Sequence, residues 1–319
     1  MIKITILIPT YNGSAYIEET LLSALNQTRK ADVVIVSDDN SIDDTLEICS
    51  RYKDKISIHK NVNGPSGFVQ GWNNAIKLVD DGYIAILHQD DLLAPTFLEE
   101  IERTIEQNPD VRHFFAPCNY IDGNGSVKRE PDYCDGTVRR YSGIDYVEAY
   151  LSYGSPNIHR CPGVVTHKSI FDKCQYRKEA GHIADDDFFY RVGQYTDVVG
   201  ILKPLASYRE HCNSETGALE DAKLVSRLAN DYLLQVAESK DNPCISDGIK
   251  RLFKERAEVF VFREYIASIK GSDVKLFLQS QKHKIELRKH GIRMPIKHKL
   301  VYLVVALLGR QFAGRFLFR

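Results

Sequence analysis

Two adjacent carboxylates end an apolar run in the first third of the chain. The segment Ile86–Asp91 (ILHQDD) passes from aliphatic side chains directly to Asp90 and Asp91. Hard divalent cations take oxygen ligands, usually one or two protein carboxylates together with the phosphates of a substrate. Two unpaired carboxylates side by side are costly unless a cation, a base or solvent compensates them. The pair therefore predicts a cation site beside a phosphorylated ligand, with a solvated turn as the alternative.

Two further acidic groups lie at the edges of apolar segments. Asp38 and Asp39 follow the run Val33–Val36, where they favour an acceptor for a base N–H or a ribose hydroxyl. Asp185 and Asp186 precede an aromatic stretch, where a carboxylate could take a proton from an attacking hydroxyl, a step worth about 10²- to 10⁴-fold in rate. The alternative in both places is a set of acids that complements a helix dipole.

Polar side chains also follow the first apolar run. Pro9 ends it, Thr10 and Asn12 offer hydrogen bonds, and Tyr11 offers a flat ring, a combination suited to a nucleobase. The alternative is a plain turn between a strand and a helix. Much further on, His211 is a candidate contact for a metal or a diphosphate, although a lone histidine is often structural.

The elements that must position these residues alternate between strands and helices. Short β-branched runs at 4–8, 33–36, 56–58 and 83–87 predict strands, and helical patterns lie between them. Ser41 and Asp44 form a capping box that predicts a helix start. This alternation predicts an α/β fold, with a mostly parallel sheet covered by helices on both faces. Ligands in such sheets bind outside the carboxyl ends of the strands.

The second half has a different pattern. Residues 114–116 and 161–166 predict further strands, and 220–290 predicts helices with few turns. We expect a nucleotide-binding domain over 1–215, a helical extension over 216–295 and a basic amphipathic tail over 296–319.

Bulk composition limits the class of protein. The net charge of −1 hides ten Lys or Arg and one acid between Lys282 and Arg319, so a nucleic-acid binder is not expected but a basic tail is. The seven cysteines are scattered and never spaced as Cys-x-x-Cys, which argues against a zinc site or a disulfide scaffold. Neither a signal-peptide pattern nor a spanning apolar stretch is found, so we expect a cytoplasmic protein.

Taken together, the segments resemble the inverting nucleotide-sugar glycosyltransferases of family 2, of the bacterial surface-polysaccharide type, over about residues 1–215. The resemblance rests on the order and spacing of these groups: Ile8–Asn12, Ser23 with Gln27 and Thr28, Ser37–Ser41 with Thr45, Asn73, Gln89–Asp91, Asp185–Arg191, and Tyr208, Arg209 and His211 with Ser214.

The resemblance implies a GT-A fold and a role for each matching residue. Asp90 and Asp91, with His211, would hold Mn²⁺ or Mg²⁺ on the donor diphosphate, with Asp91 rather than Asp90 expected as the direct ligand because His88 shortens the motif to Gln89–Asp91. Asp185 or Asp186 would be the catalytic base. The nucleotide would contact Pro9, Thr10, Tyr11, Asn12, Asp38, Asp39, Asn73 and Asp90. The reaction would be a metal-assisted single displacement from a UDP- or dTDP-sugar to a hydroxyl of a glycan or lipid-linked acceptor.

Two departures keep an alternative open. His88 and Ala184 stand where many relatives carry an acid, which favours a catalytically inactive nucleotide-diphosphate-binding protein, whereas intact Asp91, Asp185 and Asp186 favour an enzyme. A nucleotidyltransferase would carry a Gly-rich basic loop after the first strand, and a dehydrogenase would carry G-x-G-x-x-G there; neither is present.

The C-terminal segment 296–319 contains no acid and has two interpretations. One is a helix that lies on an anionic membrane, on the inner face of the plasma membrane, as suits a lipid-linked acceptor. The other is a helix packed against protein.

Overall fold

The computed structural model describes residues 2–131, 133–151, 158–212, 221–243, 245, 247–271 and 273–308. They divide into two compact units. The first takes most of the chain up to His211, and the second takes the chain from Cys212 onward together with the short stretch Glu179–Ile183. The expected domain boundary at 215, like Ser214, falls among residues 213–220, outside the described ranges.

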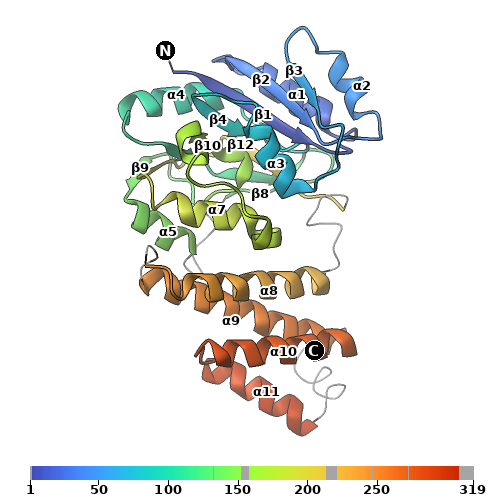
Figure 1. The fold of residues 1–319 in the computed structure, drawn as a ribbon, viewed down its shortest axis with the longest axis vertical. Helices are drawn as coiled ribbons and strands as arrows, with labels where there is room; N and C mark the ends of the chain where they lie inside the picture. The colour runs from blue at the N-terminus through green and yellow to red at the C-terminus, as the bar shows by residue number, and fades with distance from the viewer. Residues whose placement is uncertain are drawn as a thin grey trace. The chain divides into compact units, whose positions relative to one another are not determined.

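A central sheet of eight strands organises the first unit (Figure 1). Its order is β3-β2-β1-β4-β10-β6-β11-β9. The strands are β1 (Ile4–Thr10), β2 (Val33–Asp38), β3 (Ser57–Lys60), β4 (Tyr83–Ile86), β6 (His113–Phe115), β9 (Val138–Tyr141), β10 (Val164–His167) and β11 (Val198–Ile201). Strands β3, β2, β1 and β4 are parallel to one another, and β11 is parallel to β6. Strand β10 runs antiparallel to β4 and β6, and β9 runs antiparallel to β11. The expected parallel arrangement therefore holds for the N-terminal half, and the whole sheet is mixed.

A smaller sheet has the order β5-β12-β7-β8. Its strands are β5 (Leu92–Leu93), β7 (Cys118–Ile121), β8 (Val127–Arg129) and β12 (Ala206–Arg209). Because β12 pairs with β5, which directly follows Asp91, the segment that ends in Arg209 and His211 is brought beside the acidic pair.

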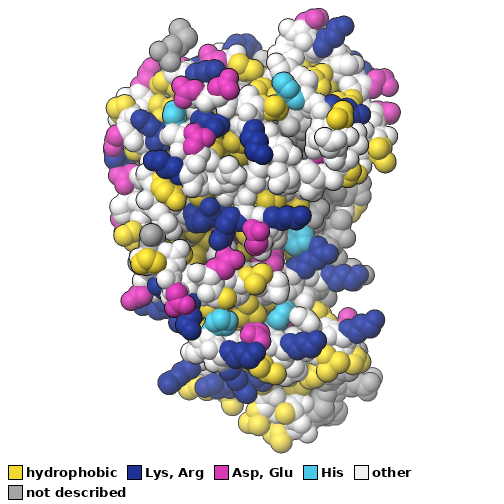
Figure 2. All heavy atoms as spheres, viewed as in Figure 1, with side chains coloured by type: hydrophobic (Ala, Val, Ile, Leu, Met, Phe, Trp, Pro, Cys, Tyr) yellow, Lys and Arg dark blue, Asp and Glu magenta, His cyan; other side chains and the backbone are white. Residues whose placement is uncertain are grey.

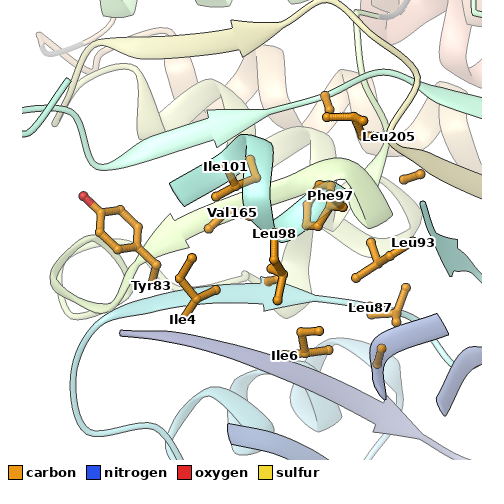
Figure 3. Close-up of a cluster of buried hydrophobic side chains, with 14 of the residues drawn as sticks. Ile4, Ile6, Tyr83, Leu87, Leu93, Phe97, Leu98, Ile101, Val165 and Leu205 are labelled. Carbon is orange, nitrogen blue, oxygen red and sulfur yellow. The ribbon is translucent and has the colours of Figure 1, made fainter. Parts of the chain in front are cut away.

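Apolar side chains from strands and helices form the core of the first unit. The helices are α1 (Ile17–Leu25), α2 (Thr45–Ser50), α3 (Phe68–Ile76), α4 (Phe97–Gln107), α5 (Gly143–Leu151), α6 (Lys168–Phe171) and α7 (Ala184–Val192), with the 3₁₀ turn η1 (Cys161–Gly163). A second 3₁₀ turn, η2 (Lys178–Ile183), belongs to the second unit from Glu179 onward. Every residue of β1 is buried, as expected of a strand covered on both faces. Figure 3 shows Ile4 and Ile6 of β1 in one cluster with Phe97, Leu98 and Ile101 of α4.

The second unit contains the helices α8 (Asp221–Ser239), α9 (Asp247–Lys270), α10 (Val274–Lys289) and α11 (Ile296–Leu308). This confirms the helical pattern predicted for 220–290. The basic tail begins as α11, and residues 309–319, with Phe312, Phe316 and Phe318, lie outside the described part of the chain. Among the described helices, none combines the length and the apolar character needed to cross a membrane.

Candidate active site

Gln89 ties together the segments that follow two neighbouring strands. Its Oε1 atom accepts hydrogen bonds from Thr10 Oγ1 (2.6 Å) and from the N–H of Tyr11 (2.7 Å), and its Nε2 atom donates to the Tyr11 carbonyl (3.1 Å). Since β1 and β4 are parallel, these segments meet at one edge of the sheet. Thr10 is buried by this contact, while Tyr11 keeps 41% of its surface exposed and could still offer its ring to a ligand.

Asp90 and His211 form the next part of the site. His211 Nε2 lies 2.9 Å from Asp90 Oδ2, and the side chain of Asp90 is 19% exposed. The histidine ring also packs on Tyr16, with 4.6 Å between the ring centroids. The sequence-predicted metal ligands Asp90 and His211 are therefore adjacent and partly open.

Arg209 holds this pair in place from inside the protein. Its side chain is fully buried, and its Nε donates to the Asp90 carbonyl (2.8 Å). Its backbone N–H donates to Asp91 Oδ1 (2.9 Å), and its guanidinium reaches Glu19 Oε2 (2.6 Å). A buried arginine that joins several carbonyl and carboxylate groups fixes the backbone on which Asp90 and His211 are carried.

The donor set fits a divalent cation that is shared with a substrate. No group of three or more His, Cys, Asp or Glu side chains that could hold a metal occurs among the described residues. Mg²⁺ and similar ions, however, are commonly bound through one or two protein groups plus substrate phosphates. One carboxylate and one imidazole fit that mode and do not fit a cage made by protein alone.

Asp91 occupies a different environment from Asp90. It is only 1% exposed, and burial followed by the charge of Asp90 raises its pKa well above the usual range. Its Oδ2 atom lies 3.7 Å from His88 Nδ1 and has no hydrogen-bond partner among the described residues. The sequence favoured Asp91 over Asp90 as the direct metal ligand, and this stays a prediction, while Asp90 is the carboxylate that pairs with His211.

His88 stands where relatives were expected to carry an acid. Its ring stacks on Trp72, with centroids 4.9 Å apart and an interplanar angle of 15°. Burial lowers the pKa of His88, which favours the neutral imidazole. The departure therefore places an uncharged aromatic ring against Trp72 in place of a third carboxylate.

Three aspartates at the start of α7 have three different roles. Asp185 accepts a hydrogen bond from the Cys161 thiol (Sγ–Oδ2 3.6 Å), and burial followed by the charge of Asp186 raises its pKa to about 7. Asp186 accepts a hydrogen bond from the Tyr150 hydroxyl (2.6 Å). A carboxyl group whose pKa lies near neutrality is suited to general-base catalysis, so the surroundings of Asp185 favour it as the base.

Asp187 is a structural member of this group. It is 1% exposed and forms ion pairs with Arg177 and with Arg191, whose Nη2 lies 2.7 Å from Asp187 Oδ2. Both oxygens are therefore neutralised by guanidinium groups. This ion-pair cluster fixes the first turn of α7, which carries Asp185.

Cys161 connects Asp185, the candidate general base, with the acidic pair Asp90 and Asp91. The pKa of its thiol is raised well above the usual range by burial, then by the charge of Asp185 and next by that of Asp91. The turn η1, which begins at Cys161, lies against β4, β5 and β12. Asp185 and the Asp90–Asp91 segment thus belong to one region of the first unit.

Asp38 binds the backbone of its own turn, and the nucleotide contact expected for it stays a prediction. It is fully buried, and its Oδ2 atom accepts hydrogen bonds from the N–H groups of Asn40 (3.1 Å) and Ser41 (2.9 Å). The Ser41 hydroxyl donates to its other oxygen. The predicted capping box is also wrong, because α2 begins at Thr45 without a side-chain cap and Ser41 is already bound to Asp38.

Asn12 likewise shapes a turn. It adopts a positive φ of 51°, its N–H donates to Ser41 Oγ (2.9 Å), and its Oδ1 accepts from the N–H of Ile42 (2.9 Å). Asn73 clamps another loop, since its amide both donates to the Tyr176 carbonyl (2.8 Å) and accepts from the Tyr176 N–H (3.1 Å). These contacts use the amide groups that the sequence assigned to a nucleotide.

Asp39 holds the loop that follows β3. Its carboxylate accepts hydrogen bonds from Asn61 Nδ2 (2.7 Å), the Ser66 N–H (2.6 Å) and Ser66 Oγ (2.9 Å). At Gly64 a Cβ atom would lie 2.6 Å from the Asp39 carbonyl oxygen, so a glycine is needed there. Pro9, in the buried end of β1, supports the same edge of the sheet. A base contact by Asp39 would have to share its carboxylate with this loop.

Several residues of the site had no role assigned from the sequence. Gln89 and Arg209 belong to the motifs named above, but their contacts join positions far apart along the chain. Trp72, Tyr150 and Cys161 carried no signal beyond their residue types, although Trp72 is the one tryptophan of the sequence. Their roles follow from the fold.

Comparison with known proteins gives one matching family model and, among the similar sequences, two relatives of interest. The family model described as "Glycosyl transferase family 2" matches residues 5–164. An uncharacterized glycosyltransferase of Rickettsia prowazekii is 27% identical over 311 residues, which cover 92% of this chain and 93% of that protein. An Escherichia coli UDP-Glc:alpha-D-GlcNAc-diphosphoundecaprenol beta-1,3-glucosyltransferase is 35% identical over 117 residues, 37% of this chain and 45% of that protein.

Two solved structures have a similar fold. Residues 1–349 of S. aureus TarS, in complex with UDP-GlcNAc, give a TM-score of 0.66 at 14% identity, covering 98% of this chain and 88% of that one. The mannosyltransferase PcManGT from Pyrobaculum calidifontis, in complex with GDP-Man and Mn²⁺, gives 0.54 at 15% identity, covering 99% and 82%.

Proposed function

The chain belongs to glycosyltransferase family 2 and has the GT-A fold, and from this premise we propose the reaction it carries out. We propose transfer of a sugar from a UDP- or dTDP-sugar to a hydroxyl of a lipid-linked glycan, with inversion at the anomeric carbon. The observation that carries the proposal is the position of the turn η1: its first residue, Cys161, bonds Asp185 (3.6 Å), and the turn lies against β4 and β5, the strands on either side of Asp90 and Asp91. A base and a diphosphate-binding segment in one region are what a direct displacement requires.

The donor binds at the carboxyl ends of β1, β2 and β4. Tyr11, held by Gln89, and Asp39 would contact the base, and Asp90 with His211 would hold a divalent cation. A bound cation supplies Lewis-acid neutralisation of the diphosphate leaving group. Asp91 and Arg209 keep the ligand-bearing backbone in place from the protein interior.

Asp185 removes the proton from the acceptor. As the acceptor hydroxyl oxygen attacks the anomeric carbon, its proton passes to the Asp185 carboxylate, and the bond between that carbon and the phosphate oxygen breaks. The nucleoside diphosphate leaves with the bonding electrons. Because attack and departure occur on opposite sides in one step, the product has the inverted configuration, and no covalent enzyme intermediate is formed.

The acceptor class rests on the named relatives. The Escherichia coli relative is named for transfer to a diphosphoundecaprenol-linked GlcNAc, and a similar lipid-linked acceptor is proposed here. The donor is proposed as a UDP- or dTDP-sugar because Asp39 can accept the imide N–H of uracil or thymine once it shares its carboxylate with Ser66.

A donor panel tests the proposal. The purified chain is incubated with UDP-, dTDP- and GDP-sugars, Mn²⁺ and a diphosphoundecaprenol-linked GlcNAc acceptor, and nucleotide release and the product anomer are measured. One donor should give an inverted product, and Asp185→Asn should bind that donor without turnover. A product of retained configuration would contradict the single displacement. Donor binding without release in any mixture would favour the inactive nucleotide-diphosphate-binding protein.

A further inference from the structure

The C-terminal helices enclose a basic cavity that the proposed reaction does not use. Residues 274–308 carry eight Lys or Arg and a single acid, Glu286. Between α10, the turn after it and α11 lies a cavity of about 480 Å³. Figure 2 shows Lys and Arg side chains gathering over these helices. The basic residues that line the cavity are Lys284, Arg288, Arg293 and Lys299.

These four cations are not neutralised by the part of the protein that the structure describes. None of them forms an ion pair with a described acid, and Glu286 is paired with Lys289 (2.7 Å). Lys284 Nζ lies 3.5 Å from the centroid of the Tyr302 ring. Burial and then the charge of Arg288 lower the pKa of Lys284, and the described residues that line the cavity include no negative charge. An anion in the cavity would supply it.

An exposed apolar stripe borders the same cavity. Ile296, Leu300, Leu303 and Leu307 of α11 are 76%, 55%, 53% and 74% exposed. Their spacing of four, three and four residues places them on one face of the helix. Leu303 lines the cavity as well. Basic groups beside an exposed apolar helix face are the combination that binds the interface of an anionic membrane.

We propose that this surface, the basic cavity with the α11 stripe, docks on an anionic phospholipid bilayer. The phosphate of a lipid headgroup enters among the four cations, and the stripe enters the boundary between headgroups and acyl chains. Charge complementarity identifies the occupant, since residues 309–319 carry three arginines and no acid and would only add positive charge. The inference goes beyond the proposed transfer reaction and can be tested without it.

Flotation with vesicles tests the proposal on the full chain. Vesicles of phosphatidylcholine with 30% phosphatidylglycerol should bind the protein at low salt and release it at high salt, and pure phosphatidylcholine vesicles should bind it much less. Arg293→Gln with Lys299→Gln should weaken binding roughly 25-fold, since each cation near an anionic surface contributes about fivefold. Leu300→Ser with Leu307→Ser should weaken it independently of salt.

A control double variant distinguishes binding at the proposed cavity from general electrostatic attraction to the membrane. Lys254→Gln with Lys275→Gln removes the same charge from exposed positions outside the cavity. An equal loss of binding in this control would overturn the docking site. The proposal would also be overturned if wild type failed to float with anionic vesicles, or if truncation after residue 308 abolished binding. It would likewise be overturned if millimolar inorganic phosphate released the protein from the vesicles as effectively as free lipid headgroup in salt of equal ionic strength.

Discussion

His211 Nε2 lies 2.9 Å from Asp90 Oδ2, although the two residues are 121 positions apart in the sequence. The pairing of β12 with β5 produces this proximity, because β5 directly follows Asp91. The buried Arg209 then fixes both backbones. The carboxylate of Asp90 and the imidazole of His211 are one anionic and one neutral metal ligand. Such a pair fits a cation that is shared with a diphosphate.

Replacing His211 by Ala should weaken Mn²⁺ affinity in the presence of UDP by about tenfold or more, because one of two protein donors is lost. The electron paramagnetic resonance signal of free Mn²⁺ measures this affinity. His59→Ala, at an exposed position of β3, is the control and should leave the titration unchanged. Equal Mn²⁺ affinity in wild type and His211→Ala would remove His211 from the metal site.

The rate of transfer should rise with pH through about 7. A general base must be deprotonated, and the pKa of Asp185 is raised to about 7. Below that pH, kcat/KM should fall about tenfold per unit. Asp186→Asn removes the neighbouring negative charge while keeping an acceptor for Tyr150, so the profile should move to lower pH. A profile that moves to higher pH, or not at all, would exclude the assigned Asp185–Asp186 coupling.

Asp185→Asn should stabilise the fold at alkaline pH. The unfolded chain releases the Asp185 proton near its ordinary pKa of 3.8, whereas the folded protein keeps it to about 7. Between these values the folded state binds more protons, so wild-type stability from this group falls as pH rises. The variant lacks this loss, and its thermal midpoint should exceed that of wild type more at pH 8 than at pH 4. A difference independent of pH would contradict the raised pKa.

Asp187→Ala should destabilise the protein by roughly 3 kcal/mol, since it leaves Arg177 and Arg191 without their buried partner. Urea unfolding measures the change. Asp172→Ala removes an exposed aspartate paired with Lys168 and should cost less than about 1 kcal/mol. If both variants lost the same stability, the Asp187 ion-pair cluster would not be what fixes the start of α7.

The strands of the N-terminal half were predictable from the sequence for a physical reason. A strand covered on both faces is apolar throughout, and the run Ile4–Ile8 has that composition. The positions of Asp90 and Asp185 at element ends were also readable. Antiparallel β10 was not readable as such, because pairing direction depends on connections over more than 75 residues between β4 and β10.

The roles of individual polar residues were less predictable. Asn73 and Tyr176 bind each other across 103 positions, and no local pattern announces such a contact. Asp38 and Asp39 look equivalent in the sequence, yet one is buried in a turn and the other holds a loop. A short motif gives the residue type, while the partners that decide between support and ligand contact come from distant segments.

Calorimetric titration of UDP, with and without Mn²⁺, on wild type, Asp90→Asn and Asp80→Asn tests the central claim most directly. Asp80 is exposed and outside the site, so it serves as the control. We expect UDP binding that requires Mn²⁺, is lost in Asp90→Asn and is unchanged in Asp80→Asn. Mn²⁺-dependent UDP binding of equal strength in all three proteins would contradict the assignment of Asp90 to the metal–diphosphate site.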